Sequence, residues 1–181
     1  MQKKDKLLKL AYPVAFVIAI VNLCFGFADA SGAWYKGLNK PAFQPPDIVF
    51  PIVWLALYAL FAISMCLVSI KPQLNQEKSP EPQKKLLITE EQRAPFFSSP
   101  REKALILYAL SGVLGVLWTY AFFWQHNSGG AVFLLIAIIT AAVLLYSEVR
   151  SIDAAAAYLL IPYTLWLCFL LCLNFEIAFL N

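Results

Sequence analysis

The sequence contains few charged residues. Only 14% of its 181 residues are Asp, Glu, Lys or Arg, whereas 61% are hydrophobic. A soluble domain usually carries about one-quarter charged residues, so this composition excludes an ordinary water-soluble fold. The formal net charge is +3, and no basic patch indicates a nucleic-acid partner. We therefore expect a protein whose partner is the lipid bilayer.

Histidine is also scarce, because His126 is the only one and it lies between apolar segments. The four cysteines lie within apolar segments, where thiols usually pack as small hydrophobic groups: Cys24, Cys66, Cys168 and Cys172. These residues do not form a metal-ligand pattern, so no metal site is expected. The sequence also has no acid–base dyad or activated nucleophile, so we do not expect the chain's own polar groups to make it an enzyme.

Five long apolar segments fill most of the chain, over about 7–28, 48–70, 104–124, 131–149 and 154–180. Each is close to the roughly 20 residues that a helix needs to cross a hydrocarbon core of about 30 Å. Strands of a membrane barrel would be about half as long and would alternate in polarity. The sequence therefore predicts an all-α integral membrane protein, a single five-helix domain over 1–181.

The basic residues are distributed asymmetrically along these segments. Twelve of the fourteen Lys and Arg fall at the N-terminus, in 71–103 or at Arg150, and only Lys36 and Lys40 fall on the other side. Basic loops stay inside, which predicts an N-terminus inside and a C-terminus outside. The basic start could also belong to a secretory signal. The length of its apolar part favours an uncleaved helix.

The segment 71–103 differs from the rest of the chain, because it is rich in Pro, Lys, Glu and Gln and nearly balanced in charge. Such a composition cannot bury enough apolar surface to fold by itself. We expect a flexible polar insertion, and a regulatory or docking segment is the alternative.

The connection 29–47 is stiff and aromatic. Prolines fix the backbone at Pro41, Pro45 and Pro46 and favour extended conformations before them. Trp34 and Tyr35 are aromatic residues of the kind that favours the membrane interface. This pattern predicts a rigid connection over one end of the bundle.

Three motifs resemble those of the TspO family, also known as tryptophan-rich sensory proteins or translocator proteins. The first is WYKGLNKPAFQPPDIVFPIVWLALY, the second is LWTYAFFWQHN, and the third is IPYTLWLCFLLCLNFEIAFLN. Apart from 71–103 and the extreme N-terminus, the resemblance covers nearly the whole chain.

The resemblance implies a ligand pocket inside a five-helix bundle, closed by the connection 29–47. Ligands of the family include protoporphyrin IX, haem-related tetrapyrroles, sterols in animal members, and synthetic isoquinoline carboxamides and benzodiazepines. Porphyrin would be a ligand, with no cofactor expected. The ligand-binding residues implied for this chain are Trp34, Tyr35, Pro45, Trp54, Tyr58, Trp118, Phe122, Trp166, Leu170 and Asn174.

Small residues in the third apolar segment permit close helix packing, at Ser111, Gly112 and Gly115. Because the family often forms homodimers, we expect a dimer interface there, with packing inside one bundle as the alternative. The family often carries Gln and Asn at the positions of Ser111 and Gly115, and Ala at that of Leu170. These departures are expected to change the polar contacts and narrow the pocket.

We expect a porphyrin-binding membrane receptor or transporter. The first alternative is light- and oxygen-dependent porphyrin degradation using Trp54 and Trp166. A scaffold or small multidrug transporter is less expected, because the acidic residues lie toward the helix ends. Sterol recognition is not expected, since the fifth segment has no basic residue at its end. The bacterial inner membrane is the expected location, and the mitochondrial outer membrane is the alternative.

Overall fold

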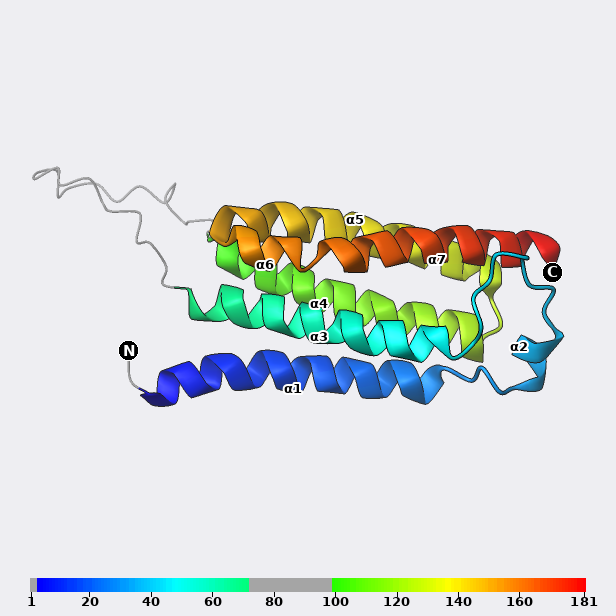
Figure 1. Cartoon of the computed structure of the whole chain (residues 1–181), viewed down its shortest axis with the longest axis horizontal. Helices are drawn as coiled ribbons and strands as arrows, with labels where there is room; N and C mark the ends of the chain where they lie inside the picture. Colours follow the sequence, from blue (N-terminus) through cyan, green and yellow to red (C-terminus); the bar gives the residue numbers. More distant parts are fainter. Residues whose placement is uncertain (1–2, 72–98) are drawn as a thin grey trace, which may run out of the picture.

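The computed structural model describes residues 3–71 and 99–181, apart from the side chains of residues 3–6, and all regular structure in these ranges is helical (Figure 1). Of the insertion expected over 71–103, residues 72–98 lie outside the described residues. The helices are α1 (Lys3–Phe27), α2 (Ala33–Gly37), α3 (Val49–Ile70), α4 (Pro100–Thr119), the π-helix η2 (Tyr120–Trp124), α5 (Ser128–Ile152), α6 (Ala154–Tyr158) and α7 (Ile161–Leu180).

The described residues include five helical spans that are long and apolar enough to cross a membrane: Leu7–Phe27, Val49–Ile70, Pro100–Trp124, Ser128–Ile152 and Ala154–Leu180. The prediction of an all-α five-span bundle is confirmed. Many apolar side chains point outward, as a lipid environment requires; Phe133 is 75% exposed and Phe179 is 79% exposed.

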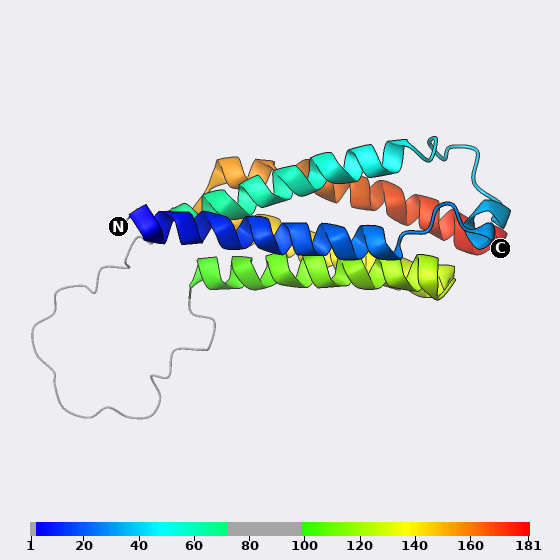
Figure 2. The same cartoon turned by 90° about the horizontal axis from the view of Figure 1, so that it is seen from below.

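The long helices run side by side along one axis. Helix α1 packs against α3 and α4 and lies between them in Figure 2, while α5 packs against α4 and α7. The α1 helix begins at one end of the bundle and α7 ends at the other, next to α2. Which end faces the cytoplasm stays a prediction from the basic residues.

The third span begins at Pro100, earlier than the Ala104 that the apolar pattern indicated. Ser99 caps the helix, because its Oγ accepts the Glu102 amide at 3.2 Å and the Glu102 carboxylate accepts the Ser99 amide at 3.5 Å. This reciprocal capping satisfies amide donors that would otherwise lack partners, so polar residues extend the helix beyond its apolar part.

The same span ends in the π-helix η2, which the sequence did not predict. The Gln125 amide donates to the Tyr120 carbonyl at 3.0 Å, and the Asn127 amide donates to the Ala121 carbonyl at 2.9 Å. Asn127 then caps α5 by accepting the Gly130 amide at 2.7 Å, so α5 starts before the predicted residue 131. Short π-helices often occur at functional sites.

The sequence predicted one continuous helix for the fifth span, but the structure contains two helices there. The span breaks between α6 and α7, where the Leu160 amide donates to the Ala157 carbonyl at 3.0 Å. Pro162 explains the break, because it has no amide hydrogen for the Tyr158 carbonyl and its ring crowds the preceding turn. The fifth segment therefore bends at its start.

Lys71 and Asp153 join α3 to α6 at the end of the bundle opposite α2. Lys71 Nζ lies 2.9 Å from Asp153 Oδ2, and Asp153 Oδ1 accepts the Ala155 amide at 2.9 Å. The hydrogen bond from Lys71, helped by the helix amides, lowers the pKa of Asp153. Asp153 therefore acts both as an ion-pair partner and as the N-cap of α6.

Replacing Asp153 should separate these two roles. Asp153→Ala is expected to lower the free energy of unfolding by about 1 to 2 kcal/mol, because the cap and the ion pair are both lost. Asp153→Asn keeps a cap and should cost less than about 1 kcal/mol, because Lys71 is half exposed. Thermal unfolding in detergent micelles would measure both variants.

The same experiment has a defined pH dependence. Because the folded-state pKa of Asp153 is lowered, its contribution is complete at neutral pH and declines as the pH falls below about 4. Equal stability of wild-type protein and Asp153→Ala at pH 7 would show that this junction does not stabilise the bundle.

Candidate ligand-binding cavity

A cavity of about 300 Å³ lies inside the bundle near α2. Its walls come from α1, α3, α4, η2 and α7, and from the connection between α1 and α3. This volume is at the lower end of the range for small-molecule sites, which are usually concave and mostly apolar. The cavity is therefore the candidate functional site.

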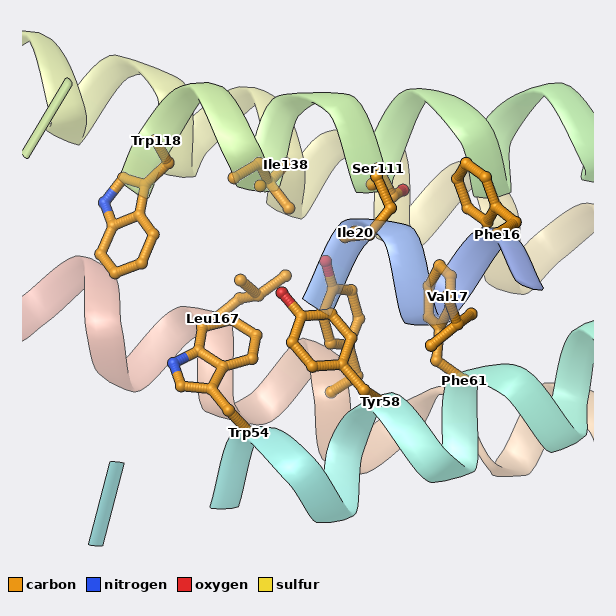
Figure 3. Close-up of a pocket in the computed structure, with 13 residues that line it drawn as sticks. Phe16, Val17, Ile20, Trp54, Tyr58, Phe61, Ser111, Trp118, Ile138 and Leu167 are labelled. Atoms are coloured by element: carbon orange, nitrogen blue, oxygen red, sulfur yellow. The ribbon is translucent and has the colours of Figure 1, made fainter. Parts of the chain in front are cut away.

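Aromatic rings form much of the cavity wall. Figure 3 shows three of them, Trp54, Tyr58 and Trp118, where they also line a narrower neighbouring cleft. Trp54 stacks on Tyr58 with ring centroids 5.3 Å apart, and Trp118 stacks on Phe122 at 6.1 Å. Trp54 on α3 and Trp118 on α4 border the same space, with centroids 6.3 Å apart. Such surfaces favour flat, aromatic ligands, because stacked rings gain more than their buried area alone provides.

Asn174 supplies a polar group in this apolar wall. Its side chain is buried, and its Oδ1 accepts the Trp118 Nε1–H at 3.3 Å. Because an indole nitrogen can only donate, this contact identifies the oxygen of the Asn174 amide. The Asn174 Nδ2 has no hydrogen-bond partner among the described residues. The cavity therefore offers a buried donor to a ligand acceptor.

Two other polar groups in the wall already have partners. The Tyr58 hydroxyl donates to Cys24 Sγ at 3.3 Å, and the Thr119 hydroxyl donates to the Gly115 carbonyl at 3.0 Å. They offer less to a ligand than Asn174, since a new contact would compete with an existing hydrogen bond.

Asp47 organises the part of the connection that borders the cavity. Its Oδ1 accepts the Tyr35 hydroxyl at 3.2 Å and the Gln44 Nε2–H at 3.3 Å. Lys40 Nζ lies 3.7 Å from the same oxygen and 3.7 Å from the Tyr35 ring centroid. These contacts join aromatic and charged side chains of the connection whose pairing the sequence does not specify.

Tyr35 is 6% exposed and lines the cavity. Burial, followed by the negative charge of Asp47, raises the pKa of Tyr35 to about 12. The phenol therefore stays neutral at physiological pH and remains a donor to Asp47.

The connection is also fastened to the end of α7. The Asn39 amide donates to Asn181 Oδ1 at 2.9 Å, and Asn181 Nδ2 donates to the Asn39 carbonyl at 3.1 Å. Phe43 packs edge-on against Phe169 with centroids 6.3 Å apart. The expected rigid connection thus has specific contacts that hold it over this end of the bundle.

Most of the predicted ligand-binding residues come together at the cavity. Seven line it directly: Tyr35, Trp54, Tyr58, Trp118, Phe122, Leu170 and Asn174. Three do not line it: Trp34, Pro45 and Trp166. Trp34 stacks on His126 at 4.4 Å and packs against Phe122 at 5.3 Å, so it supports the wall from behind.

Trp166 packs outside the lining. Its ring centroid lies 5.9 Å from that of Phe50 and 5.1 Å from that of Phe169. Phe50 lines the cavity, so Trp166 contacts a residue of the wall without reaching the cavity itself. A role for Trp166 in ligand chemistry stays a prediction.

Helix α1 also contributes lining residues that the sequence did not indicate, including Cys24 and Phe25. Its apolar side chains occur all around the helix, so no periodic pattern identified the face that packs inward. Leu170 lies in the lining, as its predicted effect on pocket width requires.

The small residues of α4 pack inside this chain. Ser111 and Gly112 are buried, and a Cβ atom on Gly112 would lie 2.9 Å from the Phe16 ring and 3.1 Å from an Ile20 side-chain carbon. Gly115 borders the cavity. Ser111 and Gly112 thus pack against neighbours in the same bundle, and a dimer interface on α4 stays a prediction.

Comparison with known proteins identifies relatives of similar length. The tryptophan-rich protein TspO of Archaeoglobus fulgidus is 31% identical over 172 residues, which cover 93% of this chain and 95% of that protein. Protein CrtK of Rhodobacter capsulatus is 28% identical over 170 residues, covering 94% and 92%. The human translocator protein is 29% identical over 142 residues, covering 78% and 71%.

The family model of the TspO/MBR family matches residues 12–180, a range that includes all five spans except the start of the first. It covers both the cavity and the connection above it. The chain is therefore an integral membrane protein that belongs to the TspO/MBR family.

Proposed function

We propose that the chain is a receptor- or transporter-like membrane protein that binds porphyrins, such as protoporphyrin IX, in this cavity. The main support for this proposal is that the cavity combines neighbouring aromatic rings with a buried donor that has no partner among the described residues, Asn174 Nδ2. A porphyrin matches both features, because its ring is flat and aromatic and its carboxylates accept hydrogen bonds.

The connection 29–47 acts as the lid of this site in the proposal. Tyr35 and Asp47 line the cavity, while Asn39 and Asn181 attach the connection to α7. A ligand that enters past the connection would require these contacts to open and then re-form. Binding and release would therefore depend on how firmly the connection is held.

Titration of the purified protein in detergent with protoporphyrin IX tests the proposal. Saturable tryptophan quenching with a shift of the main porphyrin absorption band is expected. Asn174→Leu should weaken binding roughly tenfold, because a charge-assisted hydrogen bond is lost. Thr164→Val is the matched control on α7, since its hydroxyl donates to the Leu160 carbonyl and lies outside the cavity lining.

Saturable binding that Thr164→Val preserves and Asn174→Leu weakens would support the proposal. Binding that does not saturate, or that both variants leave unchanged, would contradict it. Repeating the titration under illumination with oxygen tests porphyrin degradation. Loss of the absorption band that requires Trp54, the tryptophan stacked on Tyr58 in the wall, would favour that second function.

A further inference from the structure

A narrow cleft continues the cavity toward the middle of the bundle. The two spaces share Trp54, Tyr58, Gly115 and Trp118 in their walls. The cleft lies between α1, α3, α4, α5 and α7 (Figure 3), and its volume is about 10 Å³. That space is close to the size of one water molecule or one small chemical group.

Ser111 is a polar residue of this cleft whose hydrogen-bonding capacity is unused. Its side chain is 1% exposed, and its Oγ has no hydrogen-bond partner among the described residues. Figure 3 shows it on α4, close to Ile20 and Phe16 of α1. A hydroxyl buried without a partner is unfavourable, so it favours an occupant that can form the missing bond.

Ser111 differs in this respect from other hydroxyls on the helices. Four of them donate to the carbonyl four residues earlier, at distances of 2.7 to 3.1 Å: Ser69, Thr119, Thr140 and Thr164. This local bond is the usual solution for a hydroxyl within a helix. Ser111 does not make it, so a residue of the cleft lining has a hydroxyl whose hydrogen-bonding capacity is unused.

Gly115 lies where the cleft meets the cavity. It lines both spaces, and a Cβ atom placed on it would have no heavy atom within 4 Å. A side chain at this position would therefore extend into open space at the junction. The absence of a side chain keeps the cavity continuous with the cleft.

We propose that the cleft is a subsite for a short, neutral, hydrogen-bonding substituent of the ligand, which Ser111 binds. This inference rests on the proposed porphyrin-binding function. The rest of the cleft is lined by apolar and aromatic groups, such as Phe16, Phe61 and Leu167. A carboxylate placed there would lose its hydration among largely apolar neighbours and meet no cationic group among the described residues of the lining, whereas a neutral ligand hydroxyl or carbonyl matches the site.

The proposal also orients the ligand. Asn174 lines the main cavity and not the cleft. A porphyrin carboxylate that accepts from Asn174 therefore lies in the main cavity, and the opposite edge of the porphyrin should face Ser111. The favoured ligand class is a tetrapyrrole that carries hydroxyl or carbonyl groups on the edge opposite its carboxylates.

Two commercially available types of porphyrin provide a matched test. Haematoporphyrin carries hydroxyethyl groups on the edge opposite its carboxylates, and mesoporphyrin carries ethyl groups at the same positions. The measured quantity is the ratio of their dissociation constants. Ser111→Ala is expected to raise the dissociation constant of haematoporphyrin relative to that of mesoporphyrin by about 3- to 10-fold, the range for one neutral hydrogen bond. Its affinity for mesoporphyrin should change little.

Two further variants complete the test. Gly115→Val should also remove the preference for haematoporphyrin, because its side chain blocks the junction, and it replaces Ser111→Ala if that variant fails to fold. Thr140→Val is the control, since it removes an exposed helix hydroxyl outside the cleft and should preserve the wild-type ratio.

The outcomes distinguish a failure of the proposed subsite from a failure of the proposed porphyrin binding. A ratio that shifts in Ser111→Ala or Gly115→Val, and not in Thr140→Val, supports the subsite. If both porphyrins bind and the ratio is the same in all folded variants, the subsite is refuted while porphyrin binding stands. If neither porphyrin binds the wild-type protein, the proposed function fails and the subsite fails with it.

Discussion

Replacing Trp54 with alanine is expected to weaken protoporphyrin IX binding by roughly thirtyfold or more, about 2 kcal/mol. Trp54 lines the cavity, stacks on Tyr58 and lies at a tilt beside Trp118, which lines the same space. Its removal would eliminate a stacking surface and leave a void that the ligand does not fill. The shift of the porphyrin absorption band is the suitable readout, because tryptophan fluorescence itself changes in the variant.

Trp166→Ala is the matched control for this prediction. It removes a ring of the same size from the same end of the bundle, but Trp166 packs against Phe50 and Phe169 outside the lining. Its effect on affinity should be much smaller than that of Trp54→Ala. Equal losses in both variants would indicate a general effect on the bundle and would contradict the assignment of Trp54 to the ligand wall.

Replacing Asp47 with alanine is expected to raise the rate constant of porphyrin dissociation by about tenfold. The variant removes the acceptor of Tyr35 and Gln44 and the charge opposite Lys40. Because these contacts hold the connection together where it borders the cavity, their loss should let the connection open more often. Displacement of bound protoporphyrin IX by an excess of lipid vesicles would measure the rate.

Two variants show whether the acceptor or the charge is responsible. Asp47→Asn keeps an oxygen acceptor for Tyr35 and should increase the dissociation rate less than Asp47→Ala. Asp29→Ala removes another carboxylate from the same connection, whose contact is with the nearby Ser31 at 2.9 Å. A faster rate in Asp29→Ala than in Asp47→Ala would contradict a specific role for Asp47.

The sequence predicted much of the site because the relevant rings lie in recognisable motifs. Trp54, Tyr58 and Trp118 were expected to meet, and all three line the cavity. Their spacing indicates only the helix face on which each residue lies. It does not distinguish Trp54, which lines the space, from Trp166, whose ring packs against neighbouring phenylalanines.

Other parts of the site have no comparable signal. Helix α1 is apolar on all sides, so its sequence does not show that Cys24 would accept the Tyr58 hydroxyl. The small residues of α4 were compatible with either a second copy or the same bundle. The Phe16 and Ile20 side chains over Gly112 show that the same bundle provides the packing partner of Gly112, and a dimer interface on α4 stays a prediction.

The formation of membrane-spanning helices follows from the amino-acid sequence alone, because long apolar segments can satisfy their backbone groups in lipid only by internal hydrogen bonds. The partners of the polar side chains on those helices depend on how the helices pack. The Asn174 oxygen meets Trp118, while its nitrogen and the Ser111 hydroxyl stay unpartnered among the described residues. These outcomes depend on distances between helices that are remote in sequence, which local spacing cannot specify.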